Sequence, residues 1–253
     1  MSSEWRVTGT EFAVALRTAG LDRLPYPLRY RENADTGTQL RTQRSAAAAR
    51  LAEDQNDDLR AALEVFARPS LRIELYGFLG PNLQEIVRVH AALLGPTAVL
   101  AVQDAGTTPD TGSDLVVRRL PAKAITSRLL ELLPSCAPGR LRELTIHKSD
   151  LDDDRRGGIL TATDHVRPHD TITTFFDRPR TLVAEFGAAP GGGYDNRSDE
   201  VPTSFHVIDY ANDGRYLVRN RPNSIVAQPA TSAAVATAVD ALISRTECRS
   251  GAE

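Results

Sequence analysis

The chain has 253 residues, enough to bury one large hydrophobic core or two small ones, and its formal charge of -3 gives no general attraction to nucleic acid or anionic membranes. No run approaches the roughly 18 apolar residues of a transmembrane helix, and the first six residues lack the pattern of a signal peptide, so we expect neither membrane insertion nor a secretory leader. Two cysteines, Cys136 and Cys248, fall in an expected linker and tail, which argues against a disulfide scaffold and indicates a reducing cytosol.

The first half predicts helices followed by strands. Thr8 or Thr10 can cap a helix that Gly20 ends, and the proline-rich segment Leu24–Leu28 should be extended. Two further helices are expected over Thr38–Ala52 and from Asp57 or Asp58 to Phe66. Runs of β-branched and apolar residues then predict four strands, at Leu71–Leu79, Ile86–Leu94, Thr97–Gln103 and Leu115–Leu120. A polar loop should span Asp104–Asp114, and a helix should run from Pro121 to Leu133.

The second half begins with a weak pattern over Leu141–Gly158, whose one short apolar run is Leu144–Ile146. A helix should start at Asp170, and a strand is expected at Thr181–Phe186, followed by a polar, glycine-rich connection. Three strands then fill Phe205–Gln228, because Asp213-Gly214 and Pro222-Asn223 are turn sequences. Thr231 or Ser232 can cap the closing helix, which we expect to reach Ile243.

The two halves repeat the same landmarks in the same order. Phe-Ala-Arg-Pro at 66–69 matches Phe-Asp-Arg-Pro at 176–179, Gly95 matches Gly214, and Pro-Ala at 121–122 matches Pro-Ala at 229–230. We therefore predict an α+β fold built as a quasi-twofold repeat of a helix–four-strand–helix unit around a central antiparallel sheet. The halves should cover about 1–140 and 141–253 of a single domain.

No motif for metal or cofactor chemistry stands out. The acidic run Asp150–Asp154 lacks the glycine and the closing glutamate of a calcium loop, and Arg155-Arg156 neutralise it. The histidines His147, His165 and His169 lack zinc spacing. Gly191–Tyr194 lacks the lysine and the hydroxyl of a phosphate loop. We expect no metal, no cofactor and no catalytic residue.

The Asp-Gly hairpin presents two faces, and one of them suggests protein binding. Pairing Tyr210 with Arg215 or Leu217 leaves one face that resembles core: Phe205, Val207, Asp209, Tyr216, Val218 and Asn220. The other face mixes tyrosine, arginine and aliphatic residues, which is typical of interfaces: His206, Ile208, Tyr210, Arg215, Leu217 and Arg219. A partly solvated sheet face, covered by the arginine stems, is the alternative.

Three segments resemble the EspG family, the ESX (type VII) secretion-associated chaperones of mycobacteria and related actinobacteria. Thr10-Glu-Phe12 with Gly20–Leu28 is similar to the N-terminal helix and its proline-rich exit, and Phe66–Pro69 is similar to the helix-to-sheet junction. Asp209–Leu217, with Asp213-Gly214 and the closing helix to Ile243, resembles the C-terminal signature.

The resemblance implies a quasi-twofold fold whose central sheet is flanked by helical bundles. It implies a cytoplasmic chaperone that uses no cofactor, is not an enzyme, and holds PE–PPE heterodimers by the apolar tip of the PPE helices. Such a chaperone keeps its substrate soluble and directs it to its secretion system. The alternative is a non-enzymatic dimerising or regulatory module of another actinobacterial pathway, with a homodimer as its partner state.

Overall fold

The computed structural model describes residues 3–53, 57–108, 111–149, 168–191 and 203–250. The acidic run Asp150–Asp154, His165 and residues 192–202 lie outside these ranges. Ten strands form one sheet in which every neighbouring pair is antiparallel. The strands are β1 Ser3–Val7, β2 Leu71–Leu79, β3 Glu85–Leu94, β4 Thr97–Ala105, β5 Gly112–Pro121, β6 Leu144–His147, β7 Arg180–Pro190, β8 Thr203–Tyr210, β9 Gly214–Asn220 and β10 Ser224–Pro229.

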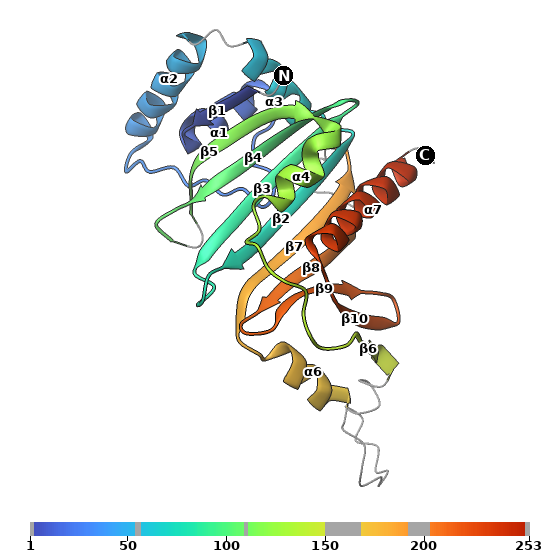
Figure 1. The fold of residues 1–253 in the computed structure, drawn as a ribbon. Helices are drawn as coiled ribbons and strands as arrows, with labels where there is room; N and C mark the ends of the chain where they lie inside the picture. The colour runs from blue at the N-terminus through green and yellow to red at the C-terminus, as the bar shows by residue number, and fades with distance from the viewer. Residues whose placement is uncertain (1–2, 54–56, 109–110, 150–167, 192–202, 251–253) are drawn as a thin grey trace, which may run out of the picture.

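The sheet joins the two halves of the chain at its middle. Its order is β1-β5-β4-β3-β2-β7-β8-β9-β10-β6, so β2 and β7 are the innermost strands. The hairpin strands β2–β5 extend to one side in chain order, and β7–β10 extend to the other (Figure 1). Strands far apart in sequence therefore lie side by side along Leu71–Leu79 and Leu182–Pro190.

Six α-helices are seen in the described residues: α1 Gly9–Thr18, α2 Gly37–Glu53, α3 Asp57–Ala67, α4 Ile125–Leu130, α6 Pro168–Phe176 and α7 Ser232–Ser250. Helix α1 starts where the sequence predicts, because Thr8 and Glu11 form a reciprocal capping box that satisfies free N–H groups of the first turn. The helix expected over Pro121–Leu133 is shorter: a 3₁₀ turn at Ala122–Ala124 leads into α4, which ends at Leu130.

One face of the sheet carries the main core under α4 and α7, which Figure 1 shows in front of the strands. Leu75 of β2 pairs with Phe186 of β7 at the centre of this core, and both are fully buried. Val235, Val239 and Leu242 of α7 pack against the same cluster. Burying such side chains stabilises the fold by about 1.5–3 kcal/mol each.

The opposite face is covered at its two ends. Helices α1 and α3 bury Phe12, Leu63 and Phe66 against β3–β5, with an edge-on contact of 5.5 Å between the rings of Phe12 and Phe66. At the other end α6 places Phe175 against β8 and β9, with ring distances of 5.4 Å to Tyr210 and 5.2 Å to Tyr216. Between these ends, the described helices α1, α2, α3 and α6 do not pack extensively along β2 and β7, although Val183 of β7 packs against the α6 cluster.

The α+β class with a large antiparallel sheet is confirmed, and β2 has the predicted bounds. The loop expected over Asp104–Asp114 is shorter, because β4 continues to Ala105 and β5 begins at Gly112. The edge strand β1 was not predicted, and β6 occupies the short apolar run that the pattern left unassigned.

The predicted register of the Asp-Gly hairpin is wrong. Tyr210 pairs with Gly214, and Asp209 pairs with Arg215. The turn contains three residues, 211–213, because Asn212 adopts a left-handed conformation with φ of 63° and the Asp213 N–H bonds the Tyr210 carbonyl. A shift of one position moves every side chain of one strand to the other face of the sheet.

Candidate protein-binding surface

The six residues predicted to share one exposed face lie on two faces of the sheet. His206, Ile208 and Tyr210 lie on the α6 side, whereas Arg215, Leu217 and Arg219 lie on the side of α7. The prediction of a single shared face is therefore wrong, and the cause is the register. Ile208, Tyr210, Arg215 and Leu217 are buried in the fold. His206 and Arg219 are partly exposed, and their contact with a partner stays a prediction.

Arg215 and Asp209 form a buried ion pair that fastens the segment between the halves to the sheet. Nε and Nη2 of Arg215 each donate to an Asp209 carboxylate oxygen at 2.7 Å. Nη2 also donates to the Pro134 carbonyl at 2.7 Å, and the Arg215 N–H bonds the Ala137 carbonyl at 2.8 Å. These bonds satisfy both charges inside the protein, so this pair has a structural role.

Arg178 joins α6 to the hairpin in the same way. Its guanidinium carbon lies 4.4 Å from the ring centre of Phe175 and 3.7 Å from that of Tyr210, and Nη1 donates to the Asp213 carboxylate at 2.5 Å. Burial opposes ionisation of Asp213, but hydrogen bonds from the Arg140 N–H, the Tyr216 hydroxyl and Arg178 outweigh it and hold its pKa below the ordinary value. The Asp213–Tyr216 segment therefore serves to hold α6 and the hairpin together.

The open middle of the α6-side face is different in character. On this face Tyr76 of β2 pairs with Glu185 of β7, and Glu185 pairs in turn with His206 of β8. One row along the strands, Phe78 pairs with Val183. Directly paired residues share a face of the sheet, so these five side chains are neighbours, and all five are partly exposed.

Tyr26 reaches this area from the segment between α1 and α2. The extended conformation predicted for Leu24–Leu28 is wrong, because the chain turns at Tyr26 and Pro27 and the Leu28 N–H bonds the Pro25 carbonyl at 3.0 Å. It is 45% exposed and precedes a cis bond to Pro27. The Nδ1–H of His90 donates to the Tyr26 carbonyl at 2.8 Å, and the rings of Tyr26 and Tyr76 lie 6.0 Å apart. Tyr76 in turn meets Phe78 at 5.3 Å. We call this set the aromatic–acidic surface: Tyr26, Tyr76, Phe78, Val183, Glu185 and His206.

The carboxylates near this surface are close to the aromatic rings. Burial raises the pKa of Tyr26, and the charges of Glu185 and Glu74 raise it further. Glu74, whose side chain is 12% exposed, pairs with Arg72 at 3.2 Å. Burial raises the pKa of Glu74 despite this arginine, and the charge of Glu185 adds to the rise. The Glu185 side chain is 42% exposed and therefore open to a partner.

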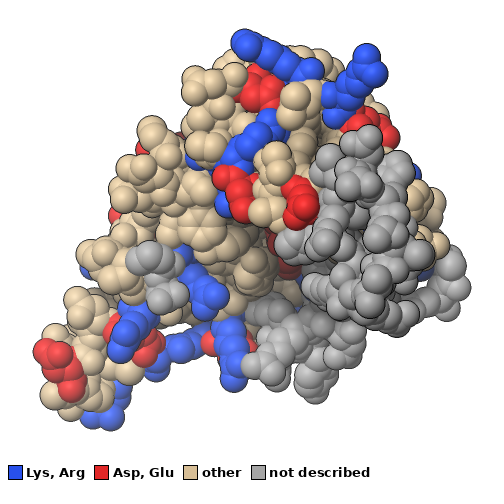
Figure 2. Space-filling model, turned by 90° about the horizontal axis from the view of Figure 1, so that it is seen from below, with Lys and Arg blue, Asp and Glu red and all other residues tan. Residues whose placement is uncertain are grey.

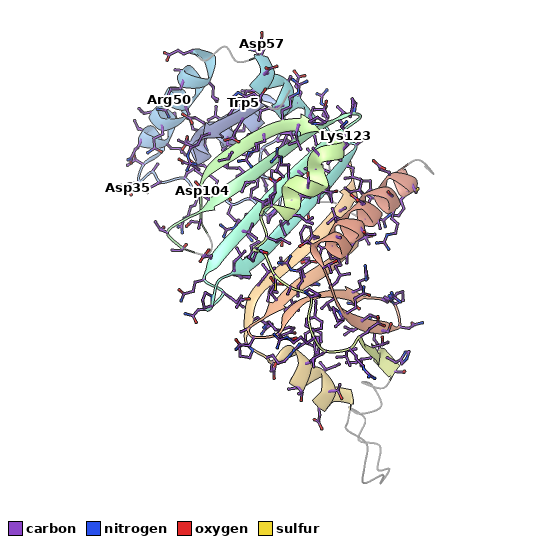
Figure 3. All side chains as sticks on the ribbon, viewed as in Figure 1. Trp5, Asp35, Arg50, Asp57, Asp104 and Lys123 are labelled. Atoms are coloured by element: carbon purple, nitrogen blue, oxygen red, sulfur yellow. The ribbon has the colours of Figure 1, made fainter. Side chains whose placement is uncertain are left out.

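Other hollows of the described chain are shallow. One of about 480 Å³ lies on the α7 side beside Leu79, Leu133 and Cys136. Another, of about 390 Å³, lies between Trp5 and Arg50, which Figure 3 labels on β1 and α2, and the Arg50–Glu11 ion pair of 2.7 Å closes one side of it. No described group of three or more His, Cys, Asp or Glu side chains could hold a metal ion. No described helix is long and apolar enough to span a membrane.

Charges of both signs are mixed over the end of the molecule shown in Figure 2, without a broad area of a single sign.

Comparison with known proteins gives a family and a fold. The EspG family matches residues 8–241. No curated protein matches the chain. Among solved structures, the chain is similar to the Mycobacterium tuberculosis type VII secretion system chaperone EspG5, solved in complex with a PE25-PPE41 dimer. The identity is 16%, the match covers 95% of this chain and 96% of the other, and the TM-score is 0.63. At this identity the likeness shows a shared fold.

Proposed function

The chain belongs to the EspG family, and we propose that it is a cytoplasmic, non-enzymatic chaperone that binds PE–PPE-type heterodimers and directs them to a type VII secretion system. The observation that carries this proposal is the family match over residues 8–241. The fold shared with a chaperone solved on a PE–PPE dimer, over nearly the full length of both chains, adds support.

The surface chemistry of the described residues supports a binding role. A chaperone of this kind must meet leucine-like side chains that are exposed on its substrate, and it does so with an accessible apolar surface edged by polar groups. The aromatic–acidic surface offers such a combination on the innermost strands of the sheet. The strongly bonded charged groups, Asp209–Arg215 and Arg178–Asp213, are occupied in holding the fold.

We also propose that the chain is one domain of two quasi-twofold halves, about 1–140 and 141–253. The strand order supports this. Outward from β2 the neighbours are β3, β4, β5 and β1, and outward from β7 they are β8, β9, β10 and β6 in the matching order. Burial supports it too: Leu71, Ile73 and Leu75 of β2 match Leu182, Ala184 and Phe186 of β7 at a constant offset of 111 residues (182 − 71), all in one core. The landmark prolines are offset by 110 (179 − 69), and the irregularity between Arg180 and Leu182 accounts for the extra residue.

Co-expression tests the chaperone proposal. The tagged chain would be produced together with each PE–PPE pair encoded in the same genome, and the purified material would be separated by size exclusion with light scattering. We expect at least one pair to elute with the chain as a ternary complex and to be less soluble without it. If the chain elutes alone or as a homodimer with every pair, the proposal is wrong and a dimerising module becomes the better account.

A further inference from the structure

The segment between α1 and α2 encloses a shallow hollow of about 410 Å³ against the C-terminal half of α1. The floor of the hollow is apolar, because Leu16 and Leu28 are buried there and Leu24 is half-buried. Four exposed arginines line its rim: Arg17, Arg23, Arg29 and Arg31. The hollow therefore combines an apolar centre with basic edges.

The backbone that carries these arginines is held by buried groups. The side-chain amide of Gln103, on β4, accepts a hydrogen bond from the Arg29 N–H at 2.8 Å and donates one to the Arg29 carbonyl at 2.5 Å. The hydroxyls of Tyr30 and Thr10 lie 2.6 Å apart and form a hydrogen bond. A binding site whose backbone is fixed in advance loses little conformational entropy when a partner binds.

The region around the hollow has an excess of positive charge. Residues 17–50 are all described, and they contain seven arginines, three acidic residues and no lysine or histidine. Their net charge is +4 (7 − 3), whereas that of the whole chain is -3. This contrast concentrates basic side chains on one part of an otherwise slightly acidic protein.

The carboxylates near the hollow already have basic partners or are too few to balance it. Glu32, on the rim, lies 3.7 Å from Arg17 and accepts a hydrogen bond from Arg44 at 2.9 Å. Asp22 is the other acidic residue of the rim. No described carboxylate lies within 4.0 Å of the guanidinium of Arg29 or Arg31.

The acidic residues of the neighbouring elements do not change this balance. Glu11 of α1 is paired with Arg50 at 2.7 Å. Asp104 of β4 and Asp114 of β5 are both paired with Arg6. The two rim arginines 29 and 31 therefore keep their charge available to an anionic partner.

We propose that this hollow is a second binding site, which takes an acidic segment of a protein partner. A leucine-like side chain of that segment would cover the apolar floor, and its carboxylates would meet Arg29 and Arg31. A compact phosphate group fits less well, because the hollow lies at the C-terminal end of α1, where the helix dipole disfavours concentrated negative charge. Carboxylates spread along a segment can reach the rim and avoid that end.

The site lies away from the strands that join the two halves. Helix α1 contacts α2 and β5, and β4 and β3 separate β5 from β2 in the sheet. Figure 1 shows α1 and α2 at the end of the sheet opposite α6. A partner bound here would leave β7 and β8 accessible. The proposal does not depend on the chaperone proposal, and its test uses the chain alone.

Fluorescence anisotropy with the full chain tests the proposal. The probe is a fluorescein-labelled peptide of repeated Glu-Glu-Leu units, compared with Gln-Gln-Leu and Glu-Glu-Ser peptides of the same length. We expect saturable binding of the Glu-Glu-Leu peptide, weaker binding of the Glu-Glu-Ser peptide and no binding of the Gln-Gln-Leu peptide. Equal binding of the Glu-Glu-Leu and Gln-Gln-Leu peptides, or no binding of any peptide, would contradict the proposal.

Variants of the chain locate the bound peptide. Arg29→Glu and Arg31→Glu should each weaken binding at least about fivefold, and Arg31→Gln less, because charge reversal replaces an attraction with a repulsion. Arg249→Glu, at an exposed position of α7, changes the net charge equally and should leave the affinity within about twofold of wild type. Melting temperatures should not change, since all three arginines are exposed. If Arg29→Glu and Arg31→Glu bind the peptide as tightly as wild type, the hollow is not its site and the proposal is wrong.

Competition distinguishes the other anionic occupants. Pyrophosphate and phosphatidylglycerol vesicles would be added at matched ionic strength to the complex of the chain with the labelled peptide. We expect neither to displace the peptide at concentrations where unlabelled peptide does. Displacement by pyrophosphate would assign the hollow to a phosphate group, and displacement by vesicles would assign it to a membrane surface. Either result would overturn the proposal.

Discussion

The Asp209 carboxylate holds the Arg215 guanidinium through two hydrogen bonds of 2.7 Å, and both side chains are only 2% exposed. Because Arg215 also bonds the Pro134 carbonyl, the pair connects the hairpin of the second half to the segment that leaves α4. Removing one member of such a buried pair lowers the free energy of unfolding strongly, whereas replacing both members with apolar residues lowers it much less.

Removing one partner of this pair should therefore destabilise the protein strongly. We expect Asp209→Ala to lower the free energy of unfolding by about 3–5 kcal/mol, because Arg215 would remain buried without a counter-charge. The double variant Asp209→Leu with Arg215→Met should lose much less. Urea denaturation followed by circular dichroism measures both. Equal losses in the single and double variants would contradict a buried-charge penalty.

Arg178 should not be replaceable by lysine. A lysine can keep a charge near Asp213, but it lacks the flat guanidinium that stacks on Tyr210 at 3.7 Å. We expect Arg178→Lys to cost about 1–2 kcal/mol of stability. Arg180→Lys, at a partly exposed position two residues away, is the matched control and should leave the melting temperature within about one degree of wild type.

His90 should make the stability depend on pH below neutrality. Burial lowers its pKa from 6.5 to about 4, so the unfolded chain binds a proton between these values and the native protein does not. Stability is fully present above pH 6.5 and falls as the pH falls towards 4, by about 3 kcal/mol from this group.

The variant His90→Asn isolates this contribution. Its amide can replace the Nδ1–H that donates to the Tyr26 carbonyl, but it does not titrate. Unfolding free energies measured between pH 7 and pH 4.5 should therefore fall less steeply for the variant than for wild type. If the free energy of unfolding falls equally steeply with pH in both proteins, His90 does not contribute to the pH dependence.

Charge at position 217 should unfold the protein and not merely weaken a partner contact. Leu217 is fully buried under α7, and a glutamate there would place a carboxylate in the main core. We expect Leu217→Glu to be recovered only in inclusion bodies or to lack a cooperative thermal transition, whereas Arg219→Glu, two positions along and partly exposed, should fold. A well-folded Leu217→Glu protein would contradict the observed register.

This last case shows where prediction from sequence fails. The alternation of residues in 205–220 identifies the two strands, but the face of each residue depends on the number of residues in the turn. The observed turn, residues 211–213 with Asn212 in the left-handed region, is one residue shorter than the turn that a Tyr210–Arg215 pair requires, and it places Asp209 opposite Arg215. The spacing of residues alone cannot distinguish these registers. The observed register differs from the predicted one in burying Arg215 beside Asp209.

The helices and inner strands were predictable because each carries its own signal, such as the capping box at Thr8 and the apolar run of Leu71–Leu79. The edge strand β1 could not be predicted. It has five residues, and only Trp5 and Val7 face the core, so its hydrophobic pattern is too short to recognise. The aromatic–acidic surface could not be predicted at all. Tyr26, Tyr76 and Glu185 come from three distant segments, and the pairing of β2 with β7 brings the last two together.

The most direct measurement is an isothermal titration of the purified chain with the PE–PPE heterodimers encoded in the same genome. The account predicts saturable binding of one heterodimer per chain for at least one pair, with the affinity reduced at high salt. A folded chain that releases no binding heat with any pair, at concentrations where size exclusion also detects no complex, would contradict it.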